Sequence, residues 1–188
     1  MAITRHRPMF WVAVVAGLLL SGGPGVALAG TVEEGIAALA SKDEEQVIAS
    51  INALGALDDP RAIPALEALC DNRLRAGADG RTWIWNSKTR DLVDPVTGAL
   101  APPAARPVRE VELDNNLRRV AMPVLAALQL AAPDADVRLA AAEQLSKEGG
   151  DQGAALLHRA LAREKDKRVL AALEMAVARA DLQSRPRR

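Results

Sequence analysis

The stretch Arg81-Thr82-Trp83-Ile84-Trp85 decides the layout of this chain. Its aromatic and β-branched residues are typical of a β-strand, and Gly80 and Asn86 bound it. The two tryptophans are the only aromatic residues between positions 30 and 188, since the remaining tryptophan and the single phenylalanine occupy positions 11 and 10. Alternation along a strand places Trp83 and Trp85 on one face. The sequence thus predicts one small β-structured insert in a chain otherwise poor in aromatic side chains.

Amphipathic helices are predicted on both sides of this insert. Two pairs match the capping-box spacing, Thr31 with Glu34 and Ser41 with Glu44, and predict helices at about residues 31–40 and 43–57. A third helix is expected to follow the Asp-Pro turn at 59–60. Beyond residue 113, six apolar residues share the i, i+3, i+4, i+7, i+8, i+11 spacing of one helix face. They are Leu117, Val120, Ala121, Val124, Leu125 and Leu128.

An internal similarity appears in the second helical region. Residues 134–140 (DADVRLA) resemble residues 166–172 (DKRVLAA), with Val137 and Val169 32 residues apart, and residues 59–63 are a fainter relative. A recurring acidic turn followed by an Ala/Leu helix at this period is typical of HEAT-like helical repeats, which bury their apolar stripes by stacking. We therefore predict a mainly α fold, a short HEAT-like α-solenoid with a small β-hairpin insert. An irregular helical bundle is the alternative.

The sequence divides into five segments on this basis. Residues 1–29 resemble a secretory signal, with a basic start, an apolar stretch over 10–20 and Ala27-Leu28-Ala29 as a cleavage pattern. N-terminal helices are expected over 30–73, a hairpin or three-stranded insert over 74–113, HEAT-like helices over 114–181 and a flexible tail over 182–188. We expect an exported, periplasmic protein, with an uncleaved signal segment as the alternative.

The composition argues against several classes of function. The chain has 24 basic and 24 acidic residues, so strong attraction to nucleic acid is not indicated. Cys70, the only cysteine, falls at helical spacing from Leu66 and is expected to be a small core residue, and His158 is expected to be solvated. No phosphate-binding loop, nucleophile elbow or metal-ligand spacing occurs. The sequence predicts no enzyme, no cofactor and no metal site.

Two features have open interpretations. Trp83 and Trp85 could close the insert onto the helices and supply apolar area to their core, or could form an exposed aromatic pair that anchors a partner protein. Arg118 and Arg119 are expected to pair with Glu112 and Asp114, the alternative being outward presentation of their charge. The candidate partner-contact residues are Trp83, Trp85, Asn115, Asn116, Arg118 and Arg119.

Five motifs occur in order along the chain. They are Asp59-Pro60-Arg61-Ala62, Asp94-Pro95-Val96-Thr97-Gly98, Asn115-Asn116-Leu117-Arg118-Arg119, residues 132–141 (APDADVRLAA) and residues 157–166 (LHRALAREKD). Their order and spacing resemble the extracytoplasmic helical extension of bacterial urea ABC transporter permeases, of the branched-chain amino-acid permease type. The Asn-Asn pair is one residue closer to Leu117 than in that family.

The resemblance implies a soluble, non-catalytic domain that contacts ABC transporter components, close to the inner membrane. It implies no permease activity, because the transmembrane helices of that family have no counterpart in this sequence. Membrane association is expected only through a partner or an uncleaved signal segment. A truncated or split permease and a free periplasmic protein are both compatible with it. The alternative is a general periplasmic HEAT-repeat scaffold unrelated to transport.

Overall fold

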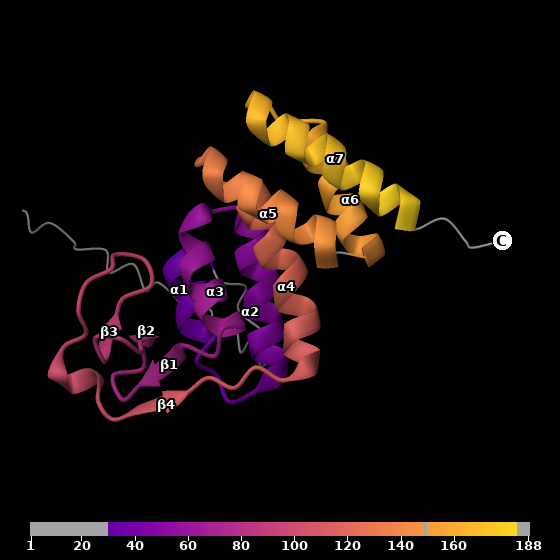
Figure 1. Cartoon of the computed structure of the whole chain (residues 1–188). Helices are drawn as coiled ribbons and strands as arrows, with labels where there is room; N and C mark the ends of the chain where they lie inside the picture. The colour runs from indigo at the N-terminus through magenta and orange to yellow at the C-terminus, as the bar shows by residue number, and fades with distance from the viewer. Residues whose placement is uncertain (1–29, 149, 184–188) are drawn as a thin grey trace, which may run out of the picture.

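Seven α-helices and one four-stranded antiparallel sheet make up the described residues, 30–148 and 150–183, of the computed structural model (Figure 1). The predicted signal segment lies outside these residues. The helices are α1 (Val32–Ala38), α2 (Glu44–Leu57), α3 (Ile63–Cys70), α4 (Asn115–Leu130), α5 (Ala135–Glu148), α6 (Gly150–Leu161) and α7 (Lys167–Gln183). The short 3-10 helices are η1 (Pro60–Ala62) and η2 (Pro103–Ala105). The mainly helical fold with a small β insert is confirmed.

The first two helices begin through different capping residues. Thr31 and Glu34 form the predicted capping box at α1, with Thr31 Oγ1 accepting from the Glu34 N–H at 3.1 Å. The prediction for α2 is wrong, because Asp43 is its N-cap and accepts from the Glu45 N–H at 3.0 Å. A carboxylate beside the first turn also interacts favourably with the helix dipole, so the aspartate takes the cap position and Ser41 supports it from outside.

The recurring aspartates have a common role at helix starts. Asp59, Asp134 and Asp166 each accept, through Oδ1, the N–H of the residue two positions later, at 2.8–2.9 Å. The helices that follow these turns are α3, by way of η1, and then α5 and α7. The sequence similarity therefore corresponds to the same turn geometry before every second helix from α3 onward.

The insert forms a sheet with the strand order β3-β2-β1-β4. Its strands are β1 (Leu74–Gly77), β2 (Thr82–Asn86), β3 (Asp91–Val93) and β4 (Val108–Glu110). Three correspond to predicted strands, but β1 was not expected, so the predicted hairpin or three-stranded insert is wrong in strand number. Leu-Arg-Ala-Gly lacks the β-branched and aromatic residues that indicate strands, and its pairing with both β2 and β4 stabilises it instead.

The two faces of the sheet have different neighbours. The register pairs Leu74 with Ile84, so both side chains face the helices, where they pack in the main core. Thr82 lies on the same face and donates to the Ile36 carbonyl of α1 at 3.3 Å. Trp83 and Trp85 point to the opposite face, as alternation along the strand predicts. The insert is thus attached to the helices through the face that carries no tryptophan.

Helix α4 connects two helical cores. The first core lies between α1, α2, α3, β1 and most of α4, and includes Leu125 and Leu128. The second consists of Leu130 at the end of α4 together with apolar residues of α5, α6 and α7. In Figure 1, α4 runs beside α2 and leads into α5, and α7 lies farthest from the sheet. Helix α4, whose apolar stripe the sequence predicts, is therefore shared by both cores.

Candidate functional site

The two tryptophans form a separate small core on the outer face of the sheet. Trp83 is 1% exposed and packs with Leu92 and Ala105, and Trp85 is half-buried beside them. The Arg81 guanidinium lies 4.8 Å from the centre of the Trp83 ring. The expectation that both tryptophans fill the helical core is wrong, because a loop closing over the sheet covers them instead. They do not form an exposed pair either, since Trp83 is buried.

Arg81, the arginine beside Trp83, also links two segments of the insert. Arg81 reaches the Asp94 carboxylate at 2.5 Å, and Asp94 accepts from the N–H groups of Val96 and Thr97, each at 2.9 Å. Burial raises the pKa of Asp94, but these hydrogen bonds and Arg81 outweigh it and hold the pKa below its usual value. The predicted Asp-Pro-x-Thr-Gly turn is confirmed, with Gly98 at a φ of +70° that favours glycine. This turn is a structural element of the insert.

The two candidate asparagines lie at the start of α4. Asn115 is exposed, whereas Asn116 is half-buried and donates to the Glu44 carboxylate at the start of α2. Asp114 caps the helix by accepting from the Leu117 N–H at 2.8 Å. The amide of Asn116 therefore joins the first turns of α2 and α4, and of the two asparagines only Asn115 is exposed to solvent.

The predicted ion pairs of Arg118 and Arg119 do not form. Arg119 donates to the Asn116 side-chain oxygen at 2.6 Å, and the Arg118 guanidinium has no hydrogen bond or ion pair among the described residues. Among the described residues, Asp114 accepts the Leu117 N–H through Oδ1, and neither arginine bonds to its carboxylate. Both arginines are exposed, so the alternative in which they present charge outward is the observed arrangement.

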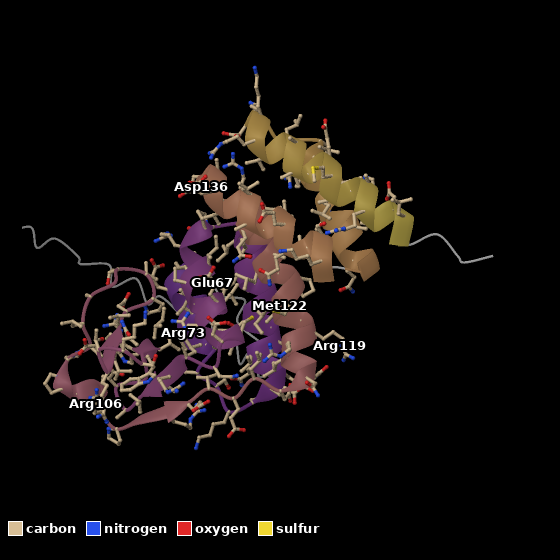
Figure 2. The ribbon with its side chains drawn as sticks, in the orientation of Figure 1. Glu67, Arg73, Arg106, Arg119, Met122 and Asp136 are labelled. Atoms are coloured by element: carbon tan, nitrogen blue, oxygen red, sulfur yellow. The ribbon has the colours of Figure 1, made fainter. Side chains whose placement is uncertain are left out.

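Both arginines border a cleft of about 580 Å³ between helices α3, α4, α5 and α6. Figure 2 labels three of its lining residues, Glu67, Met122 and Arg119, which lie below α5 in this view. Apolar atoms come from Met122, Leu145 and Leu156, all half-buried. Polar groups around them are Glu67, Asp71, Gln129, Gln144 and Gln152. Its volume lies within the range of about 300–1,000 Å³ that is usual for ligand pockets.

Helix α3, whose C-terminal end borders the cleft, is short. It has 8 residues, against 14 in α5, and it ends where Asn72 adopts a left-handed φ of 56° and the Arg73 N–H returns to the Ala68 carbonyl at 2.7 Å. The chain then turns away into β1. The cleft lies between this end of α3 and helices α4, α5 and α6.

Cys70 lies among charged residues on the wall of the cleft that α3 forms. The pKa of the Cys70 thiol is raised to about 11, chiefly by burial, while Arg118 lowers it and Asp71 and Glu67 raise it by smaller amounts. Cys70 packs against the main core and is half-buried, so the expected core position is correct for only one side of the residue. A thiol with this pKa is almost entirely protonated at neutral pH and is a poor nucleophile.

His158 does not line the cleft. His158 is exposed, with Nε2 3.1 Å from Asp181 Oδ1 on α7. Within residues 30–148 and 150–183, no group of three or more His, Cys, Asp and Glu side chains is arranged to hold a metal ion. In the same ranges, no helix combines the length and apolar character needed to cross a bilayer.

The sequence identified only part of the cleft. Arg118 and Arg119 were singled out by a motif, but Glu67, Met122 and the three glutamines were not. A signal for the α4 wall does exist, because residues 118, 122, 126 and 129 follow helical spacing in a second stripe beside the core stripe. On α5 the lining residues 141, 144 and 145 also follow helical spacing, and on α6 residues 152 and 156 are one turn apart.

Comparisons with protein-family models, with curated proteins and with solved structures find no match for this chain.

Proposed function

We propose that this chain is a non-catalytic helical module that binds a protein partner in the cleft between α3, α4, α5 and α6. The observation that carries the proposal is the cleft itself, which joins half-buried apolar side chains to exposed arginines at the junction of two cores. Grooves between helices that combine an apolar floor with charged edges suit recognition of a protein segment.

The arrangement of the helices supports a HEAT-like interpretation of the fold. Helix α2 packs on α4, α4 on α6 and α5 on α7, while neighbours α4 with α5 and α6 with α7 also pack together. Contacts of this kind are expected when helix pairs stack in a solenoid. The aspartate turns before α3, α5 and α7 add a repeated local structure. On this proposal the cleft interrupts the layer formed by those three helices.

The proposed partner is a component of a urea-type ABC transporter. The support is the resemblance of five ordered motifs to the soluble extension of such permeases, and one of these motifs supplies Arg118 and Arg119 to the cleft. The signal-like residues 1–29 favour a periplasmic location near the inner membrane. The module would act there by protein contact, either as part of a divided permease or as a separate periplasmic protein.

The test is crosslinking and co-purification of the tagged chain from the membrane fraction, together with urea uptake after deletion of its gene. We expect transporter subunits to be recovered with the chain and urea uptake to fall. Absence of transporter subunits, with urea uptake unchanged, would overturn the proposal. The Gln144→Trp variant, in which an exposed side chain of the cleft becomes bulky, should reduce recovery, while Arg179→Glu on α7 should not.

A second candidate function is a general periplasmic helical scaffold. The repeated aspartate turns favour it, because they support stacked helices without reference to transport. Recovery of one defined partner that is not a transport component would favour this candidate, and recovery of transporter subunits would exclude it.

A further inference from the structure

We propose that the occupant of the cleft is an acidic amphipathic helix of the partner protein. This inference rests on the proposed interaction function and adds the chemistry of the bound segment. Three observations support it: the charges that stay uncompensated around the cleft, the apolar side chains within it, and the helices that form its walls.

The charge balance within the cleft favours an acidic ligand. Asp71 pairs with Arg73 at 2.9 Å, whereas Glu67 accepts from the neutral Gln129 amide at 2.8 Å, so one acidic group of the cleft has no ionic partner against two arginines. Arg118 has no hydrogen bond or ion pair among the described residues, and Arg119 bonds only to the neutral Asn116 side chain. Carboxylates of a ligand could therefore bind two guanidinium groups without displacing an existing ion pair.

The apolar side chains favour a ligand with an apolar stripe. Met122 on α4, Leu145 on α5 and Leu156 on α6 lie in the same cleft and are each half-buried. Burial of their remaining surface would stabilise a complex, and methionine adapts to ligands of different shape. A ligand with one apolar face and acidic residues beside it would satisfy both sets of groups.

The walls favour a helix as the shape of that ligand. All four walls come from helices. A helix seated there would pack against α4 and α5 by the same ridges and grooves that join the helices of the fold.

The experiment uses two synthetic 18-residue peptides with leucines at i, i+3, i+4 and i+7. One carries glutamates at the flanking positions, and the other carries lysines at the same positions. Binding to the purified protein is followed by fluorescence anisotropy of the labelled peptide. We expect the glutamate peptide to bind, the lysine peptide not to bind, and the glutamate affinity to decrease as salt is added.

Variants test whether the cleft is responsible. The double substitution Arg118→Glu with Arg119→Glu should lower the affinity for the glutamate peptide about tenfold or more and allow the lysine peptide to bind. Gln144→Trp should also lower the affinity for the glutamate peptide, because the larger side chain fills the cleft. The matched control is Arg179→Glu, because Arg179 is exposed on α7 and does not line the cleft. Far-UV circular dichroism and thermal unfolding confirm that each variant is folded.

Equal binding of the two peptides, binding of neither, or equal loss in the Arg179→Glu control would overturn the inference. The outcome is separable from that of the proposed function. If transporter subunits are recovered but the charge-reversed variant recovers them equally well, the interaction function stands and the acidic-helix inference fails. If the glutamate peptide binds through the arginines but no transporter subunit is recovered, the chemistry of the cleft stands and the proposed partner is wrong.

Discussion

The outer core of the sheet and the core of the C-terminal helices achieve burial in opposite ways. The outer core depends on one large side chain, Trp83, covered by Leu92 and Ala105. The C-terminal core has no aromatic residue and consists of alanine, leucine and valine side chains spread over α5, α6 and α7 with Leu130. One burial is concentrated in a single residue and the other is distributed, so their sensitivity to substitution should differ.

The largest expected effect follows from truncating the two central side chains. Trp83→Ala should lower the free energy of unfolding by about 4 kcal/mol, because the small core loses most of its buried surface at once. Leu157→Ala, in the C-terminal core, should lower it by about 3 kcal/mol. Guanidinium unfolding followed by far-UV circular dichroism measures both. A larger loss for Leu157→Ala than for Trp83→Ala would contradict the comparison.

A smaller effect concerns an ion pair between α5 and the turn that precedes α7. Arg138 on α5 donates through Nε and Nη2 to both carboxylate oxygens of Glu164, at 2.8 and 3.1 Å, and the side chains are 17% and 6% exposed. Removing one partner from a buried pair leaves the other charge uncompensated. Glu164→Gln should therefore lower the free energy of unfolding by about 2 kcal/mol, less than for fully buried pairs since Arg138 is partly exposed.

The same pair predicts a pH dependence. The hydrogen bonds from Arg138 lower the pKa of Glu164 to about 2, from an ordinary value of 4.5. A carboxylate with a depressed pKa in the folded state stabilises the protein fully above the unfolded value, and this stabilisation is lost as the pH falls from about 4.5 towards 2. Glu164→Gln should show a weaker loss of stability over that window. The control is Arg168→Gln, whose pair with Asp136 is largely exposed and should contribute little.

The smallest effect distinguishes the two tryptophans by fluorescence. With Trp11→Phe as the background, a Trp85→Phe variant reports on Trp83 and a Trp83→Phe variant on Trp85. Trp83 is buried and should emit at shorter wavelength and resist acrylamide quenching, whereas the half-buried Trp85 should be quenched more readily. Equal quenching of the two would show that the outer core is open, contrary to the concentrated burial described above.

Local signals in the sequence predicted much of the helical structure. The capping pair at Thr31 and the apolar stripe of α4 are short-range features, and both correspond to observed elements. The cap of α2 was misplaced because Ser41 and Asp43 are two residues apart and only their geometry distinguishes them. Strand β1 was missed because its stability comes from partners on both sides and not from its own residues.

Features that depend on distant parts of the chain could not be derived in the same way. Alternation along the strand placed the two tryptophans on one face of the sheet. It did not show which face this was, because the residues that cover them are as distant as Leu92 and Ala105. The cleft depends on how α5 and α6 pack beside α3 and α4, which local spacing does not specify, although Met122 and Gln129 lie on one stripe of α4. Whether Arg118 and Arg119 pair with Glu112 or Asp114 depends on side-chain geometry that sequence spacing does not specify.

The sharing of α4 has a thermodynamic consequence. Leu128 and Leu130 are one turn or less apart, yet they belong to different cores. Loss of either core would expose part of the helix that the other core needs, so the two should melt together in a single cooperative transition. A ligand seated against the middle of α4 would then raise the melting temperature of the whole module, including the distant sheet around Trp83.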